Sequence, residues 1–335
     1  MARLRRSDWR EPGITRRRQG SGYTYLTAKG ERVCDPEILE RVKSLAIPPA
    51  WSEVWICVHA NGHLQAVGID DAGRRQYLYH ERWRTQRDAK KHEEAQHLGR
   101  RLALLRRSCA RDLKSRGLNR DRVLATATRL LDLGLFRVGG ERYASENDSY
   151  GLATLQRDHV LPMNGGGIKF EFPAKSGQTS SFVITHPVVC QAVRELLKRR
   201  DPSPELLGWW DPTSRAWCDV RSEHINEHLK TLVSSDTTAK DFRTWHGTVL
   251  MAMHLGDLVR SGTAVTGRRL TELYREVASE LGNTGTVTRN SYVNPKVVDL
   301  AVEGLVIDAV RKQRHELVPL PASRAVFRLL QSQTP

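Results

Sequence analysis

The pattern of apolar residues changes near residue 81, and this change limits the chain to a mixed architecture. Residues 20–80 alternate short apolar and polar stretches between turn signals, which is typical of antiparallel strands. Residues 81–113 are rich in helix-forming Arg, Lys, Glu, Ala and Leu, and helical spacing of apolar positions resumes after Asp121. We therefore predict an α+β fold with a small N-terminal antiparallel β-sheet domain, residues 1–82. A larger, mainly α-helical domain follows in residues 83–335, and the 335-residue length favours this division.

Within this outline the turn signals locate individual elements. The expected elements of the first domain are a helix near 36–45 and strands over 54–58, 63–69 and 74–79. Asn61-Gly62 supplies the turn between the first two of these strands, because such a pair favours a tight hairpin. In the second domain we expect a single hairpin, with strands over 168–172 and 180–184.

Charge indicates the kind of partner. The chain has 53 Lys and Arg against 38 Asp and Glu, a formal net charge of +15, and a large excess of one sign favours a polyanionic partner. Residues 81–120 hold 13 Lys and Arg against five Asp and Glu. Met1–Gly20 carries seven Arg and no apolar segment, so we interpret it as a basic arm and not as a secretory signal. No apolar run reaches the length of a membrane span, and nucleic acid is the partner we expect, with no membrane.

Cysteine usage favours a reducing compartment. The five cysteines are odd in number and widely spaced, at positions 34, 57, 109, 190 and 218. Such a pattern argues against structural disulfides and against a zinc ribbon. We expect a cytoplasmic, nucleoid-associated protein.

Four short segments contain the residues suited to phosphate chemistry. They are Leu135-Phe136-Arg137-Val138-Gly139 with Tyr143, Phe172-Pro173-Ala174-Lys175-Ser176-Gly177, Lys240-Asp241-Phe242-Arg243-Thr244, and Gly282-Asn283-Thr284 with Arg289 and Ser291-Tyr292-Val293. Each segment alone is a weak signal, because an isolated Arg, Lys or Tyr is more often a surface or packing residue. The order of residue types is specific: Arg, Lys, Lys-x-x-Arg, a polar residue and Tyr.

This order resembles the catalytic set of the type IB DNA topoisomerases, particularly the compact bacterial and poxvirus branch, from about Tyr23 to about Asp299. The resemblance implies two lobes that form a clamp around double-stranded DNA. It implies a monomer that cleaves one strand, forms a 3′-phosphotyrosyl intermediate and reseals it, relaxing positive and negative supercoils with no cofactor, metal or ATP. The implied catalytic residues are Arg137, Lys175, Arg243, Asn283 and Tyr292.

The residue types fit this chemistry. A Tyr292 phenolate conserves the energy of the broken phosphodiester as a phosphotyrosine ester, so resealing needs no ATP. Two guanidiniums, Arg137 and Arg243, can neutralise charge on the non-bridging oxygens with planar, permanently charged forks. Lys175, at the tip of the expected hairpin, is the natural general acid for the leaving 5′-oxygen.

Other segments match the family's DNA contacts. Gly73-Arg74-Arg75-Gln76-Tyr77-Leu78-Tyr79 looks like the family's strand that enters the major groove, where Gln76, Tyr77 and Tyr79 would touch bases or backbone. The further predicted DNA-binding residues are Arg74, Tyr143, Lys240 and Arg289.

Two departures from the family pattern change the expectation. Many members have His where this chain has Asn283, and Asn can donate a hydrogen bond to a phosphate oxygen but cannot carry a proton. Pro173-Ala174 precedes Lys175 where the family often has Gly, which would stiffen that loop or shift the Lys.

Two alternatives remain open at this point. A tyrosine recombinase or integrase shares the Arg, Lys, Arg and Tyr residues, but typically has His-x-x-Arg where this chain has Lys240-x-x-Arg243. A non-enzymatic DNA-binding protein of the same fold would explain the basic charge equally well.

The histidines do not indicate a metal site. His224 and His228 lie four residues apart, but no third zinc ligand is evident. His246 and His254 are expected in core or surface roles.

Overall fold

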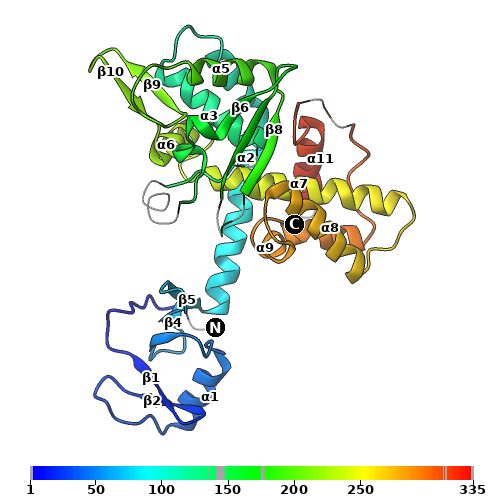
Figure 1. Ribbon diagram of the computed structural model, residues 1–335. Coiled ribbons are helices and arrows are strands. Elements are labelled where there is room, and N and C mark those ends of the chain that lie inside the picture. The colour runs from blue at the N-terminus through cyan, green and yellow to red at the C-terminus, as the bar shows by residue number, and fades with distance from the viewer. Residues whose placement is uncertain are drawn as a thin grey trace. The chain divides into compact units, whose positions relative to one another are not determined.

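The structure is a computed structural model that describes residues 3–134, 136–140, 148–174, 177, 179–311, 313 and 315–332. The chain divides into two compact units, residues 1–90 and 91–335 (Figure 1). Helix α2 (Glu81–Asp112) contains the boundary between them. The domain boundary expected after residue 82 stays a prediction, because a helix that continues through it does not define where an isolated domain would end.

The N-terminal unit is built on one antiparallel sheet. Its strands are β1 (Ile14–Gln19), β2 (Gly22–Leu26), β3 (Ser52–Ile56), β4 (Leu64–Ile69) and β5 (Arg75–Tyr79), in the order β2-β1-β3-β4-β5. Helix α1 (Pro36–Ser44) begins at Asp35, whose side chain accepts hydrogen bonds from the amides of Glu37 and Ile38. Apolar residues of the sheet, among them Ile56 and Ala66, form a core with Val42 of the helix. The expected strands over 54–79 and the helix near 36–45 are confirmed.

The interpretation of Met1–Gly20 as an arm is wrong, because Arg5 already pairs with Gly62 and strand β1 begins at Ile14. Strand β1 pairs with both β2 and β3, and Ile14 is buried in the core. The guanidinium of Arg16 donates to the carbonyl oxygens of Ile47, Pro48 and Trp51. A run of arginines, Arg16 to Arg18, hides this strand in the sequence, because it interrupts the alternation of apolar and polar residues. Its partner β2 follows directly, whereas its partner β3 lies further along the chain.

The larger unit is mainly helical. Besides the C-terminal part of α2, its helices are α3 (Arg120–Gly134), α5 (Pro187–Leu197), α6 (Ser222–Leu232), α7 (Ala239–Arg260), α8 (Gly267–Leu281), α9 (Gly285–Ser291), α10 (Pro295–Val302) and α11 (Leu320–Gln331). Helices α3 and α7 are buried along most of their length, and α8, α10 and α11 each contact α7. A helix that is buried on most sides can hold polar residues of its own in fixed positions, and α7 does so at Arg243.

Two small sheets complete this unit. Strands β6 (Val160–Pro162), β7 (Ile168–Pro173) and β8 (Thr179–Ile184) form an antiparallel sheet, and β9 (Gly208–Asp211) pairs with β10 (Ala216–Asp219). The expected hairpin is therefore confirmed as β7–β8, but the expectation of a single hairpin is wrong. Strands of three or four residues are too short to show a period of two in the sequence.

An ion cluster in the core ties several helices together. Asp132 of α3 accepts from Arg106 Nε at 2.8 Å and from Arg129, and Arg129 also donates to Glu316 at 2.7 Å. His246 Nε2 of α7 lies 3.2 Å from Asp132 Oδ1. Burial, together with nearby Arg106, lowers the pKa of His246 to about 3, so the ring is neutral at ordinary pH. His246 is fully buried and therefore has the first of the two roles, core or surface, that were expected for it.

His254 is half-buried, and its Nδ1 lies 3.4 Å from Glu276 Oε2. In the described part of the chain, no helix combines the length and the apolar character that crossing a membrane requires.

Candidate active site

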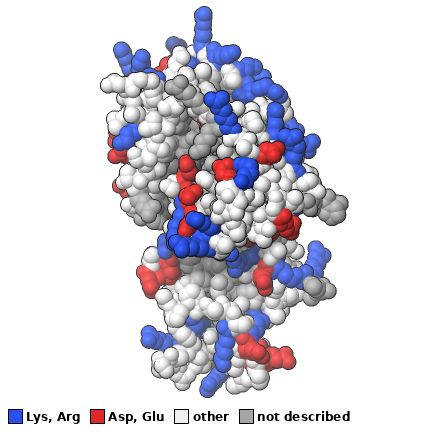
Figure 2. All heavy atoms as spheres, turned by 90° about the vertical axis from the view of Figure 1, so that its right-hand side faces the viewer, with Lys and Arg blue, Asp and Glu red and all other residues white. Residues whose placement is uncertain are grey.

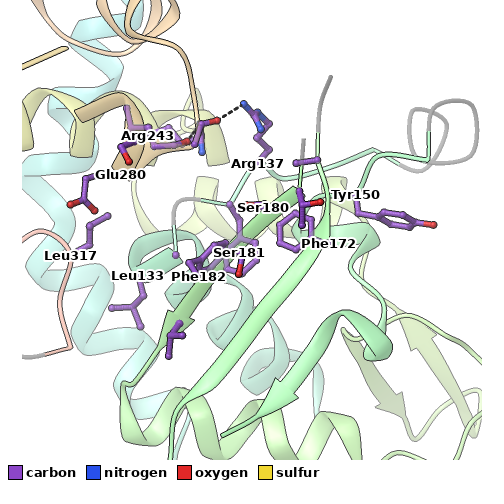
Figure 3. A pocket seen from close by; sticks show the side chains of 18 residues that line it. Leu133, Arg137, Tyr150, Phe172, Ser180, Ser181, Phe182, Arg243, Glu280 and Leu317 are labelled. Carbon is purple, nitrogen blue, oxygen red and sulfur yellow. Dashed lines mark hydrogen bonds between the residues drawn. The ribbon is translucent and has the colours of Figure 1, made fainter. Parts of the chain in front are cut away.

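The C-terminal end of α8 brings two arginines together from distant parts of the chain. Arg137, which follows α3, donates from Nη2 to the Gly282 carbonyl oxygen at 3.2 Å, and Arg243 donates from Nη2 to the Leu281 carbonyl oxygen at 2.6 Å (Figure 3). These carbonyls lack partners within the helix and carry its negative dipole end, so they attract cations. Gly282 has a left-handed φ of 58°, which lets the chain turn there at little cost. The helix end therefore holds both guanidiniums in place.

Asn283 links this helix end to Arg137. Its Oδ1 accepts from Arg137 Nη2 at 2.7 Å. Its Nδ2 is shielded from solvent and has no hydrogen-bond partner within the described residues. Because Arg can only donate, the oxygen of the amide must face it, and the NH₂ group is left as a donor. This orientation suits Asn283 to donate to a phosphate oxygen held by Arg137.

Tyr292 lies beside Arg243. The guanidinium carbon of Arg243 is 5.1 Å from the centre of the Tyr292 ring, and Arg243 is only 3% exposed. Burial lowers the pKa of Arg243, but a guanidinium stays charged in proteins. Burial alone would raise the pKa of Tyr292, yet Arg243, with Arg137 and Lys240, lowers that pKa below its ordinary value. The phenolate form of Tyr292 is therefore favoured by the cations around it.

The main chain at Tyr292 is held against α7. The Thr248 hydroxyl accepts from the Asn294 amide at 3.0 Å and lies 3.3 Å from the Tyr292 carbonyl oxygen. At Gly247 a Cβ atom would come within 3.4 Å of the Tyr292 Cβ, so the two segments are in close contact. Thr248 was not among the residues predicted from the sequence, because nothing in its local pattern shows which distant segment its hydroxyl contacts.

Tyr292 follows a polar stretch that contains Gly and Thr, which is typical of an exposed segment. Residues Gly285–Ser291 nevertheless form α9, and Tyr292 is half-buried at the end of this helix. Its ring packs against the main core of the unit. The helix forms because Thr284 caps it, accepting from the Val287 amide at 3.3 Å.

Four further residues of this unit were predicted from the sequence to act on DNA or to contact it. Lys175 and Tyr143 lie outside the described residues, although the flanking strands end and begin at Pro173 and Thr179. Lys240 is exposed in the first turn of α7, one turn before Arg243. Arg289 is exposed on α9, with its guanidinium carbon 5.9 Å from the centre of the Tyr274 ring.

A pocket of about 350 Å³ opens beside the two arginines. Figure 3 shows Phe172, Phe182 and Ser181 of the β7–β8 hairpin on one side and Arg243 and Glu280 on the other. The pocket is lined by aromatic rings together with cationic and hydroxyl groups. The pocket is continuous with the arginine site, so the hairpin that carries Lys175 borders the same space.

In the N-terminal unit the predicted DNA-contacting residues lie on β5, an edge strand of the sheet. Tyr77 and Tyr79 are 43% and 41% exposed, with ring centres 6.2 Å apart and nearly parallel. Gln76 points to the other face, where its Nε2 donates to Asp70 Oδ2 at 2.8 Å. Two exposed tyrosines on such a strand form a suitable surface for nucleic acid.

His224, one of the two histidines spaced four residues apart, has a local role. His224 Nδ1 accepts from the Arg221 amide at 3.1 Å, and its ring packs edge-on against Trp209. Among the residues that the structure describes, no three His, Cys, Asp or Glu side chains are grouped so that they could hold a metal ion.

Comparison with known proteins assigns the family. Residues 80–316 match the family model of the catalytic core of eukaryotic DNA topoisomerase I, and residues 22–70 match that of the N-terminal domain of bacterial DNA topoisomerase IB. The chain therefore belongs to the type IB DNA topoisomerase family. This match confirms the family that the motifs resemble, and with it the α+β fold and the enzyme class. DNA is the substrate that this family implies.

Individual relatives agree with this assignment. DNA topoisomerase 1B of Acanthamoeba polyphaga mimivirus is 27% identical over 293 residues, which cover 86% of this chain and 87% of that protein. DNA topoisomerase 1 beta of Arabidopsis thaliana is 27% identical over 69% of this chain, but only 24% of that protein is covered. For DNA topoisomerase 1 of Candidozyma auris the identity is 27%, and the coverage is 64% of this chain and 28% of that protein.

Proposed function

We propose that this protein relaxes supercoiled DNA by cutting one strand of the duplex with Tyr292, allowing rotation and resealing the strand. The observation that carries the proposal is the grouping of Arg137, Arg243, Asn283 and Tyr292 around the end of α8. These residues lie up to 155 positions apart in the sequence, and the family order alone predicts that they act together. Their grouping supports a site that binds one phosphodiester between two guanidiniums and a phenol.

The proposed reaction is a transesterification. The Tyr292 hydroxyl loses its proton to solvent water and the phenolate oxygen attacks the phosphorus. A P–O bond to the enzyme forms as the bond to the 5′-oxygen breaks. Arg137 and Arg243 stabilise the charge that gathers on the non-bridging oxygens, and Asn283 donates a further hydrogen bond. Lys175 supplies the proton that the leaving 5′-oxygen takes up. The product is a 3′-phosphotyrosyl enzyme and a free 5′-hydroxyl end.

Resealing is the same reaction in reverse. The 5′-hydroxyl attacks the phosphotyrosine, Lys175 takes back its proton, and Tyr292 leaves as a phenolate that its neighbouring cations stabilise. The bonds broken and formed are both phosphate esters, so we propose that neither ATP nor a metal ion is needed. Rotation of the free end before resealing would relax supercoils of either sign.

Binding of duplex DNA rests on charge and on the exposed residues of each unit. On the face of the larger unit drawn in Figure 2, Lys and Arg side chains are widely spread and Asp and Glu are fewer. In the N-terminal unit Arg74, Gln76, Tyr77 and Tyr79 are the proposed contacts, and Lys240 and Arg289 are those of the larger unit. The closed clamp, the monomeric state and the nucleoid-associated location stay predictions.

The test of the proposed function is plasmid relaxation in EDTA without nucleotide. We expect the purified chain to relax both negatively and positively supercoiled plasmid under these conditions. A recombinase would need partner sites, and a binding protein would shift the DNA in a gel without relaxing it. A strict requirement for Mg²⁺ or ATP would contradict the proposed mechanism.

Thr248→Val is expected to slow cleavage by about 10- to 100-fold, because misplacement of a reacting group by about 1 Å can cost about 100-fold in rate. Valine has nearly the shape of threonine, but it leaves the Asn294 amide without its acceptor and loosens the contact with the Tyr292 carbonyl. Single-turnover cleavage of a duplex oligonucleotide measures the effect. Thr248→Ser keeps the hydroxyl and should restore most of the rate. Equal rates for Thr248→Val and the unaltered protein would show that this contact does not position Tyr292.

A further inference from the structure

Gly151 lies directly against the main chain of the Arg137 segment. A Cβ atom at Gly151 would come within 2.4 Å of the Cα and nitrogen atoms of Gly139 and within 2.8 Å of the Arg137 carbonyl oxygen. These neighbours are backbone atoms, so they cannot turn aside as the end of a side chain could. Only a residue without a side chain allows two backbones to approach so closely.

The two residues after Gly151 hold the same segment by hydrogen bonds. The Leu152 amide donates to the Arg137 carbonyl oxygen at 2.8 Å, and the Ala153 amide donates to the Val138 carbonyl oxygen at 2.7 Å. Leu152 and Ala153 are both buried in the main core of the unit. The main chain of Arg137 is therefore fixed to the core, while its side chain is fixed at the end of α8.

Tyr150, the residue before this contact, holds a second part of the site. Its amide donates to the Pro173 carbonyl oxygen at 2.9 Å, and Pro173 ends strand β7 of the hairpin that carries Lys175. Tyr150 also lines the pocket beside the arginines, on the side of the hairpin (Figure 3). Three consecutive residues therefore join the main chain of Arg137 to the end of β7.

A buried hydroxyl group braces this segment. Thr154 Oγ1 accepts from the Gly151 amide at 3.0 Å and lies 3.3 Å from the Gly151 carbonyl oxygen. The Thr154 amide donates to the same carbonyl oxygen at 3.1 Å. Because Thr154 is only 2% exposed, water cannot readily replace these contacts. A shift of Gly151 away from Arg137 would therefore break hydrogen bonds that have no substitute.

We propose that Gly151 is a positioning residue for the strand-cutting reaction, because it lets one segment support both Arg137 and the hairpin that carries Lys175. The inference rests on the proposed function, since it assumes that Arg137 binds the phosphate and that Lys175 protonates the leaving oxygen. Gly151 itself touches neither DNA nor the reacting atoms in this proposal. It fixes the place of the guanidinium relative to the general acid.

Gly151→Ala is expected to slow single-turnover cleavage by about 100-fold, because its methyl group must displace the Arg137 segment by about 1 Å, and such a misplacement can cost that factor. Gly140→Ala is the matched control. A Cβ atom at Gly140 would meet no atom of the described residues within 4 Å, so this variant should cleave at nearly the normal rate. Thermal unfolding measured by circular dichroism shows whether each variant is folded.

A second measurement separates positioning from a general loss of structure. A substrate with sulfur at the 5′-bridging position has a leaving group that needs no proton, so the contribution of Lys175 is removed. In an Arg137→Ala background the contribution of the guanidinium is removed as well. There Gly151→Ala should change the rate on this substrate by less than about 2-fold, because both groups through which Gly151 acts are absent. A generally weakened protein would keep the 100-fold loss of the first measurement, within about 2-fold.

If Gly151→Ala does not fold, Thr154→Val takes its place, because it nearly keeps the side-chain shape but removes the acceptor of the Gly151 amide. It should slow cleavage by about 10-fold or more, and Thr154→Ser should restore most of the rate. A folded Gly151→Ala or Thr154→Val that cleaves at the normal rate would overturn the inference. So would an undiminished loss in the Arg137→Ala background on the sulfur-containing substrate. Failure of the unaltered protein to relax plasmid would instead contradict the proposed function.

Discussion

Tyr292→Phe is expected to abolish DNA cleavage while the protein still folds and binds DNA. The change removes one oxygen, and the ring keeps its packing against the core and its position beside Arg243. Binding should persist because the proposed backbone contacts come from other residues. The expected loss is complete within the detection limit of a plasmid relaxation assay, because a phenylalanine ring offers no nucleophile.

Tyr274→Phe is the matched control for this prediction. Tyr274 is a buried tyrosine on α8, near Arg289, and its burial raises its pKa, so it is poorly suited to attack a phosphate. That variant should cleave at nearly the normal rate. Denaturing the unaltered protein during reaction, digesting it and measuring peptide masses should locate the 3′-phosphate on Tyr292. An adduct on another residue, or plasmid relaxation by Tyr292→Phe, would defeat the assignment.

Lys175→Ala is expected to slow cleavage by about 100- to 10,000-fold, the usual range for loss of a general acid. Lys175 lies outside the described residues, so this prediction rests on the family order and on the β7–β8 hairpin that borders the arginine pocket. A substrate with sulfur in place of the 5′-bridging oxygen has a leaving group that needs no proton. On that substrate the variant should recover most of its rate.

Lys169→Ala provides the control for the change in charge. Lys169 lies on β7 of the same hairpin and pairs with Glu171, and its side chain is 37% exposed. Its loss should change cleavage little on either substrate. If Lys175→Ala stays equally slow with the sulfur-containing substrate, Lys175 stabilises charge or loop structure and does not donate the proton.

Local patterns predicted most elements that have a strong local signal. The β3–β4 hairpin, the long α2 and the β7–β8 hairpin all follow from turn residues or from periodicity over many positions. The loop between β3 and β4 covers residues 57–63, however, and is longer than the tight turn expected at Asn61-Gly62. Strands β1, β2 and β6 and the β9–β10 pair were missed. A run of arginines masks β1, and β6, β9 and β10 have only three or four residues each, too few to show a period.

The family and the type of chemistry were available from the sequence by itself. The order of Arg137, Lys175, Lys240-x-x-Arg243, Asn283 and Tyr292 is a property of the chain, and the comparisons confirm the family that this order resembles. The choice of residue types also constrains the chemistry, because only certain side chains can attack, protonate or neutralise a phosphate. These conclusions follow from the sequence alone, since they depend only on which residues are present and on their order in the chain.

Only the tertiary structure decided how these residues are held. Arg137 and Arg243 donate to the carbonyls that end α8, and Thr248 contacts the segment of Tyr292. All of these contacts join segments that are far apart in the chain. The hydrogen bond from Gln76 Nε2 to Asp70 Oδ2 likewise fixes the orientation of the Gln76 amide. Sequence patterns report the local backbone, whereas hydrogen bonds of this kind depend on the packing of whole helices and strands. For that reason the half-buried position of Tyr292, beside a guanidinium that lowers its pKa, became apparent only in the folded chain.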